Sequence, residues 1–103
     1  MVKKINEAQF EEVRNSAVAV VDFSAVWCGP CKMLAPVLEE VAGDLQSQVN
    51  FFNVDVDECQ NLAGEFGIMS VPCLILFKDG VKVDQAVGFQ PREAIAQWIR
   101  SHL

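Results

Sequence analysis

Apolar positions along this chain follow two periods, and their alternation predicts the order of its secondary structure. Residues 18–23, 49–54 and 73–77 are mostly apolar at neighbouring positions, as in strands that are buried on both faces of a sheet. A long segment between the first two instead has an apolar residue every three or four positions, which is typical of one helix face. This face comprises Leu34, Val37, Leu38, Val41 and Leu45.

Shorter elements are indicated by residues that cap helices. Asn6 followed by Gln9 resembles a capping box, so we expect a first helix over residues 7–15. A second short helix is expected over residues 58–66, because Gly67 can adopt the left-handed conformation that ends many helices. Each of these helices would precede one of the buried strands.

The end of the chain carries a hairpin signal and a helix signal. Lys78-Asp79-Gly80 predicts a turn into a strand at about 82–87, and Pro91 suits the first position of a closing helix. The apolar face of that helix comprises Ala94, Ile95, Trp98 and Ile99. The complete order predicts an α/β fold with a mixed sheet between two layers of helices, in a single domain over residues 1–103.

Charge and length exclude several function classes. The chain has 103 residues and a formal net charge of −6, and its eight lysines and arginines are scattered, so no basic stripe is available for nucleic acid. Its apolar runs are far shorter than the ~20 residues that span a bilayer, and its first residues do not resemble a targeting signal. We therefore expect a cytoplasmic monomer without a nucleic-acid or membrane partner. In that compartment thiols stay reduced unless they alternate between thiol and disulfide during catalysis.

The motif Cys28-Gly29-Pro30-Cys31 lies where the first buried strand gives way to the long helix. At the helix start, the sulfur of Cys28 can accept a hydrogen bond from the N–H of Cys31, and the helix dipole favours a thiolate there. Cys28 is therefore the candidate nucleophile and Cys31 the resolving thiol. Gly29 permits close approach of a partner, and Pro30 stiffens the turn. Closing the pair gives a disulfide that remains reducible, which is the chemistry of a redox catalyst.

The other cysteines do not indicate a metal site. Cys59 and Cys73 stand alone and far apart, and His102 is the only histidine, so neither a zinc site nor a Cys–His hydrolase is expected. We interpret Cys73 as a small core residue. Cys59 is expected at the start of an exposed helix, where the charges of Asp57 and Glu58 disfavour its thiolate.

Asp22 is a carboxylate inside a strand that is otherwise apolar. Burial should raise its pKa and lower the stability of the fold above pH ~3.9. This loss of stability is explained if Asp22 transfers protons to and from Cys31 through a water molecule. The alternative is a structural aspartate near the strand end whose carboxylate is satisfied by water.

Pro72 stands at the entrance of the strand over residues 73–77. Because proline cannot donate to a sheet ladder, this position indicates an edge or a cis turn. A cis bond between Val71 and Pro72 would turn the backbone of Val71 outward, free to pair with an extended peptide. From the residues alone a trans bond remains the more common form.

These features together resemble the thioredoxin family over nearly the whole chain. The matching segments are Asp22-Phe23, Ala25-Val26-Trp27-Cys28-Gly29-Pro30-Cys31-Lys32, Pro36, Val71-Pro72, Phe77-Lys78-Asp79-Gly80 and Val87-Gly88. The resemblance implies a thioredoxin fold, with a central mixed sheet of about five strands flanked by about four helices, and a cis Pro72. It also implies a substrate groove formed by Trp27, Gly29, Pro30, Val71, Pro72 and Gly88.

The activity that the resemblance implies is general protein-disulfide reduction by the Cys28–Cys31 pair. Electrons would come from a thioredoxin reductase and pass to protein disulfides, for example in reductases and peroxidases, without a bound cofactor or metal. The source of the electrons, NADPH or ferredoxin, stays open. One alternative is a binding or structural subunit that keeps the fold but not the redox role. A further alternative, a disulfide oxidase or isomerase, would differ only in the reduction potential of the Cys28–Cys31 pair.

Three positions depart from the common bacterial pattern of that family. Ser24 stands where a tryptophan is usual, and Cys73 replaces the threonine after the proline. Phe51 is interpreted as occupying the place of a lysine that often neighbours the buried aspartate. Without that cation, Asp22 should be harder to ionise.

Overall fold

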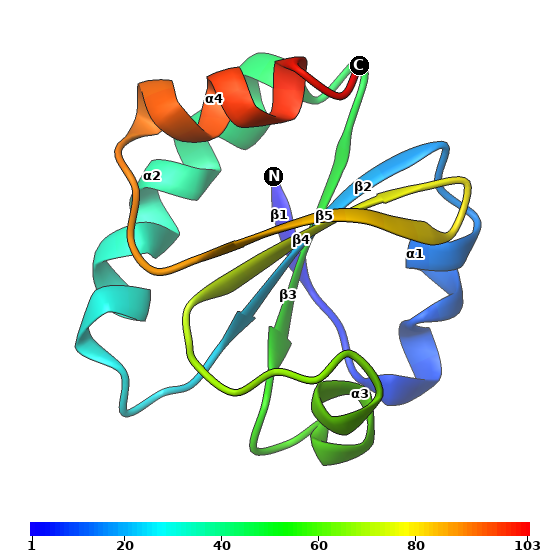
Figure 1. Ribbon diagram of the computed structural model, residues 1–103, viewed down its shortest axis with the longest axis vertical. Coiled ribbons are helices and arrows are strands. Elements are labelled where there is room, and N and C mark those ends of the chain that lie inside the picture. The colour runs from blue at the N-terminus through cyan, green and yellow to red at the C-terminus, as the bar shows by residue number, and fades with distance from the viewer.

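The computed structural model describes residues 1–103, which form one five-stranded sheet in the order β1-β3-β2-β4-β5 (Figure 1). The strands are Val2–Lys4 (β1), Val18–Ser24 (β2), Asn50–Asp55 (β3), Cys73–Lys78 (β4) and Val81–Val87 (β5). Strands β1, β3 and β2 run parallel, whereas β4 is antiparallel to β2 and β5 is antiparallel to β4. The mixed sheet expected from the sequence is confirmed.

Helices cover both faces of this sheet. They are the 3-10 helix Glu7–Gln9 (η1) and the α-helices Glu11–Arg14 (α1), Gly29–Leu45 (α2), Gln60–Glu65 (α3) and Arg92–Arg100 (α4). Helices α2 and α4 lie together on one face, and α1 and α3 lie on the other (Figure 1). None of the helices is both long and apolar enough to cross a membrane.

Strand β2 lies at the centre of the sheet and contributes to two separate hydrophobic cores. Val20 packs with the apolar face of α2 and α4, whereas Val21 and Phe23 pack with α1 and α3 on the opposite face. All three side chains are fully buried. Because burying one such side chain contributes about 1.5–3 kcal/mol, β2 is held firmly in register between both helix layers.

The N-terminal segment differs from the sequence prediction in two respects. No strand was expected at Val2–Lys4, yet β1 pairs with Phe51, Phe52 and Asn53 of β3 at the edge of the sheet. This strand is mostly polar and exposed, so it carries no apolar period from which it could be predicted. The helix expected over 7–15 is divided into η1 and α1, although its capping box between Asn6 and Gln9 is confirmed.

Two other helices begin later than predicted. Helix α3 starts at Gln60 rather than 58, because Asp55 Oδ1 accepts hydrogen bonds from the N–H groups of Asp57 and Glu58 and holds that segment in a turn. Pro91 has an extended backbone (ψ 160°) and is the N-cap of α4, one position before the helix rather than its first residue.

Candidate active site

The two cysteines of the motif meet at the N-terminus of α2. Cys28 is the N-cap residue, and the N–H of Cys31 donates a hydrogen bond of 3.2 Å to Cys28 Sγ, as the sequence predicts. The two residues form a disulfide, with their Cα atoms 5.3 Å apart. No acidic residue lies in the first turn of α2 to oppose the helix dipole.

Exposure does not distinguish the two cysteine residues in this oxidised state. Cys28 is 5% exposed and Cys31 is 4% exposed. Position does distinguish them, because the sulfur of Cys28 caps the helix and that of Cys31 lies inside its first turn. A negative charge on Cys28 would therefore gain both the hydrogen bond and the helix dipole.

The Val71–Pro72 segment lies beside the disulfide. The peptide bond is cis, as the family resemblance implies, and Cys28 Sγ lies 3.7 Å from the carbonyl oxygen of Val71. Neither the N–H nor the carbonyl of Val71 is hydrogen-bonded to another backbone group. Gly88, with a φ of +94°, donates its N–H to the Pro72 carbonyl at 2.8 Å. The structure thus brings Val71 to the disulfide and joins Gly88 to the neighbouring Pro72.

Trp27 is exposed but makes a side-chain hydrogen bond. The residue is 68% exposed, and its Nε1 donates a hydrogen bond of 2.8 Å to Asp57 Oδ2. Gly29 and Pro30, which complete the predicted groove, are also exposed, and nothing lies within 4 Å of the position of a Cβ at Gly29. The surface around Cys28 is therefore open to a polypeptide.

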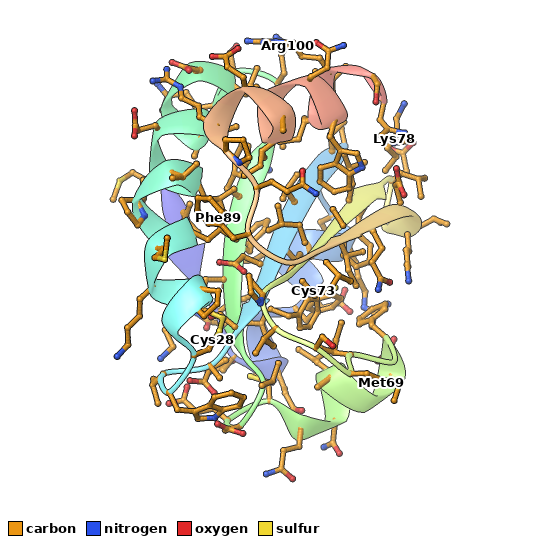
Figure 2. The ribbon with its side chains drawn as sticks, turned by 60° about the vertical axis from the view of Figure 1, so that its left-hand side comes forward. Cys28, Met69, Cys73, Lys78, Phe89 and Arg100 are labelled. Carbon is orange, nitrogen blue, oxygen red and sulfur yellow. A yellow bond between two sulfur atoms is a disulfide. The ribbon has the colours of Figure 1, made fainter.

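Between Trp27 and Val71 lies a shallow apolar pocket that sequence reasoning missed. Its lining also includes Val56, Ile68, Met69 and Ser70. Met69 is 96% exposed and lies at the same end of the molecule as Cys28, far from Lys78 and Arg100 (Figure 2). The sequence feature that could have indicated this pocket is the apolar residue Met69, which directly precedes the Ser70-Val71-Pro72 segment.

Asp22 is buried on the face of the sheet that α2 covers. It is 3% exposed, and burial raises its pKa from an ordinary 3.8 to about 6, a shift that a hydrogen bond from Asn53 partly opposes. Its Oδ1 atom has no hydrogen-bond partner. Asp22 and Cys31 both line a cleft of about 420 Å³ that is open to solvent.

The residue next to Asp22 on β3 is Asn53, not Phe51. The parallel register pairs Asp22 with Asn53, and Phe51 with Val20. Phe51 is buried in the core beneath α2 and α4. The interpretation of Phe51 as the neighbour of the buried aspartate is therefore wrong by two positions. An uncharged neighbour remains, but it is an amide that can donate hydrogen bonds.

The two remaining cysteines are both buried. Cys73 is 1% exposed in the core, which confirms its interpretation as a small core residue, and burial raises the pKa of its thiol. Cys59 precedes α3 as its N-cap residue, and most of that helix is exposed as predicted, but the side chain of Cys59 itself is only 1% exposed. Burial raises its pKa first, and the charges of Glu7, Glu58 and Asp55 add to this effect. Neither thiol is activated.

The disulfide at a helix N-terminus defines a dithiol–disulfide redox site, and comparison with known proteins gives its family. The model of the family Thioredoxin matches residues 1–101. Thioredoxin of Staphylococcus saprophyticus is 51% identical over 99% of this chain and 98% of its own length, and thioredoxin of Staphylococcus aureus is 48% identical over the same shares. A solved structure of Plasmodium falciparum thioredoxin, 34% identical, superposes with a TM-score of 0.90 over 99% of this chain and 100% of its own.

The chain belongs to the thioredoxin family, and its architecture is the thioredoxin fold. It is a thiol–disulfide oxidoreductase that reduces disulfides through the Cys28–Cys31 pair.

Proposed function

We propose that this chain is a general reductase of protein disulfides, in which Cys28 attacks and Cys31 resolves. The Cys28 thiolate displaces one sulfur of the substrate disulfide, which leaves as a thiolate and takes up a proton. Cys31 then loses its proton and attacks Cys28 Sγ, so that the mixed disulfide breaks and the second substrate thiol leaves. Two electrons pass to the substrate, and the Cys28–Cys31 disulfide forms. The N-cap position of Cys28 is the observation that carries this assignment.

Asp22 is the proposed proton acceptor for Cys31. Both residues line the same solvent-open cleft, and a pKa of about 6 lets the carboxyl group both take up and release a proton near neutral pH. A water molecule in this cleft would carry the proton between them. The structural alternative, an aspartate satisfied by water alone, predicts no effect of Asp22 on the resolving step.

The substrate is proposed to bind as an extended segment along Val71. The N–H and carbonyl of Val71, which have no backbone partner, suit pairing with such a segment next to the sulfur of Cys28. Trp27, Gly29, Pro30, Pro72 and Gly88 would form the walls of this groove. Targets of this kind include reductases and peroxidases that cycle through a disulfide.

Electrons are proposed to return through a thioredoxin reductase, with the chain acting as a cytoplasmic monomer and electron carrier. The family relationship supports this partner, and the net charge of −6 suits a basic docking surface. No resident cofactor is required, because the dithiol itself stores the two electrons.

The roles of the cysteines can be tested by trapping the mixed disulfide. Incubated with a disulfide peptide, Cys31→Ser should accumulate a stable adduct at Cys28, because no resolving thiol remains. Cys28→Ser should form none, and Cys73→Ser should reduce insulin at nearly the normal rate. An adduct that forms in Cys28→Ser but not in Cys31→Ser would reverse the assignment of nucleophile and resolving thiol.

A further inference from the structure

Asn53 links two polar side chains that end strand β2. Its Nδ2 donates a hydrogen bond of 2.8 Å to Ser24 Oγ, a second of 3.2 Å to the Asp22 carbonyl, and lies 3.5 Å from Asp22 Oδ2. Asp22 and Ser24 are two positions apart and so project from the same face of the sheet. Asn53 lies opposite Asp22 in the parallel register.

The hydrogen bond to Ser24 determines which end of the Asn53 side-chain amide faces Asp22. An amide side chain carries two N–H donors at one end and an oxygen at the other, and rotation by half a turn exchanges them. With one hydrogen committed to Ser24, the second faces the carbonyl and Oδ2 of Asp22. Without Ser24 the amide oxygen could turn toward the carboxylate instead, which would disfavour its charge.

No other group compensates for the burial of Asp22. Its cleft is lined by Lys4 of β1, by Cys31, Lys32 and Glu39 of α2, and by Asp55 of β3. On β4 its paired residue is the apolar Leu74, next to the buried thiol of Cys73. None of these shifts the pKa of Asp22, for which burial and the Asn53 hydrogen bond are the two causes. Asn53 is thus the one group that favours the carboxylate.

We propose that Asn53, locked in orientation by Ser24, is a positioning residue that holds Asp22 Oδ2 and stabilises the charged carboxylate while Oδ1 exchanges the proton of Cys31. This rests on the proposed proton role of Asp22. The division of labour follows from the contacts, because Oδ2 faces the amide whereas Oδ1 has no partner. Asn53 acts through Asp22 and does not touch the reacting sulfurs.

The experiment compares two asparagines on the same strand. Asn50 Nδ2 donates to Ser16 Oγ at 2.9 Å, so Asn50→Leu removes the same type of amide–hydroxyl bond away from the cleft. Asn53→Leu removes the amide that faces Asp22, and Ser24→Ala removes the hydroxyl group that orients this amide. Ser24→Thr keeps a hydroxyl group at position 24. The carboxyl of Asp22 is titrated by carbon-13 NMR in the oxidised protein, and the pH profile of the resolving step is measured with a disulfide peptide.

Asn53→Leu should raise the pKa of Asp22 by about half to one pH unit and move the rise of the pH profile upward equally. Ser24→Ala should raise the pKa of Asp22 by a smaller amount. Ser24→Thr should leave this pKa as it is in the unsubstituted protein. Asn50→Leu should leave both curves in place. If Asn53→Leu does not fold, Asn53→Ala serves, because it removes the amide and adds no bulk.

The proposal is overturned if Asn53→Leu leaves the titration of Asp22 in place, or if Asn50→Leu shifts it equally. The role of Asp22 itself is tested separately with Asp22→Asn. An unchanged pH profile in that variant would reject proton transfer by Asp22, whereas the NMR titration still reports whether Asn53 controls its charge.

Discussion

Glu7 Oε2 accepts a hydrogen bond of 2.8 Å from the backbone N–H of Asn61, 54 positions further along the chain. The same oxygen accepts the N–H of Leu62 at 3.2 Å, and Oε1 accepts the side-chain amide of Asn61 at 3.3 Å. The N-cap residue of α3, Cys59, makes no side-chain cap bond. Glu7 therefore supplies from a distant helix the acceptor that the first turn of α3 lacks locally.

Replacing Glu7 by alanine should lower the free energy of unfolding by about 1–2 kcal/mol, because two backbone N–H groups lose a charged acceptor. Urea unfolding monitored by circular dichroism measures this change. The matched control is Glu11→Ala, which removes an exposed ion pair with Arg14 at 3.5 Å and should change stability by less than about 0.5 kcal/mol. Equal effects of the two substitutions would contradict a capping role for Glu7.

Replacing Asp22 by asparagine should stabilise the oxidised protein at pH 8 but not at pH 3. The folded pKa of about 6 lies above the ordinary 3.8, so the unfolded chain releases this proton more readily. The native state therefore loses stability as the pH rises from about 4 to 6, by about 3 kcal/mol in total, and the loss is constant above that range. Urea unfolding of both proteins at several pH values measures the difference. A stability difference that is independent of pH would show that Asp22 titrates normally.

Gly80 occupies a tight turn between β4 and β5 that should not accept a side chain. Its φ is +82°, and a Cβ there would lie 2.9 Å from the backbone oxygen of Arg14. Gly67 also has a positive φ, +62°, but nothing lies within 4 Å of its Cβ position. Gly80→Ala should therefore destabilise the fold by at least about 1 kcal/mol more than Gly67→Ala, since contact adds to backbone strain. Thermal unfolding of the two variants gives this difference, and equal values would exclude the contact as a cause.

Asp57 should influence activity through Trp27. Asp57→Ala removes the acceptor of the Trp27 Nε1–H, so the exposed ring should become more mobile. Because one hydrogen bond contributes about 0.5–1.5 kcal/mol, kcat/KM for a protein disulfide should fall about 2- to 10-fold. Fluorescence anisotropy in a Trp98→Phe background reports on Trp27 alone.

Asp57→Asn is the control, since its amide oxygen can still accept the bond from Trp27. It should retain most of the activity and the anisotropy of Trp27. A loss of activity as large as that of Asp57→Ala would show that the charge of Asp57 matters rather than its hold on the ring.

The sequence alone determined the long elements and the reactive motif. The almost continuous apolar run of residues 18–23 predicts a strand buried on both faces, and the apolar residues at every third or fourth position predict the long helix. Both patterns are local, because the polarity of each residue indicates whether its own side chain is buried. Cys28 and Cys31 are near neighbours in the chain, so their capping geometry is local and follows from the helix start.

Only the tertiary structure decided which distant groups meet. Asn53 faces Asp22 because two parallel strands pair in one register, whereas the family resemblance alone led to Phe51. The edge strand at Val2–Lys4, the burial of Cys59 and the capping of α3 likewise depend on contacts between separate segments. Contacts of this kind leave no periodic signal in any one segment, since neither partner determines the other's position until the whole sheet has formed.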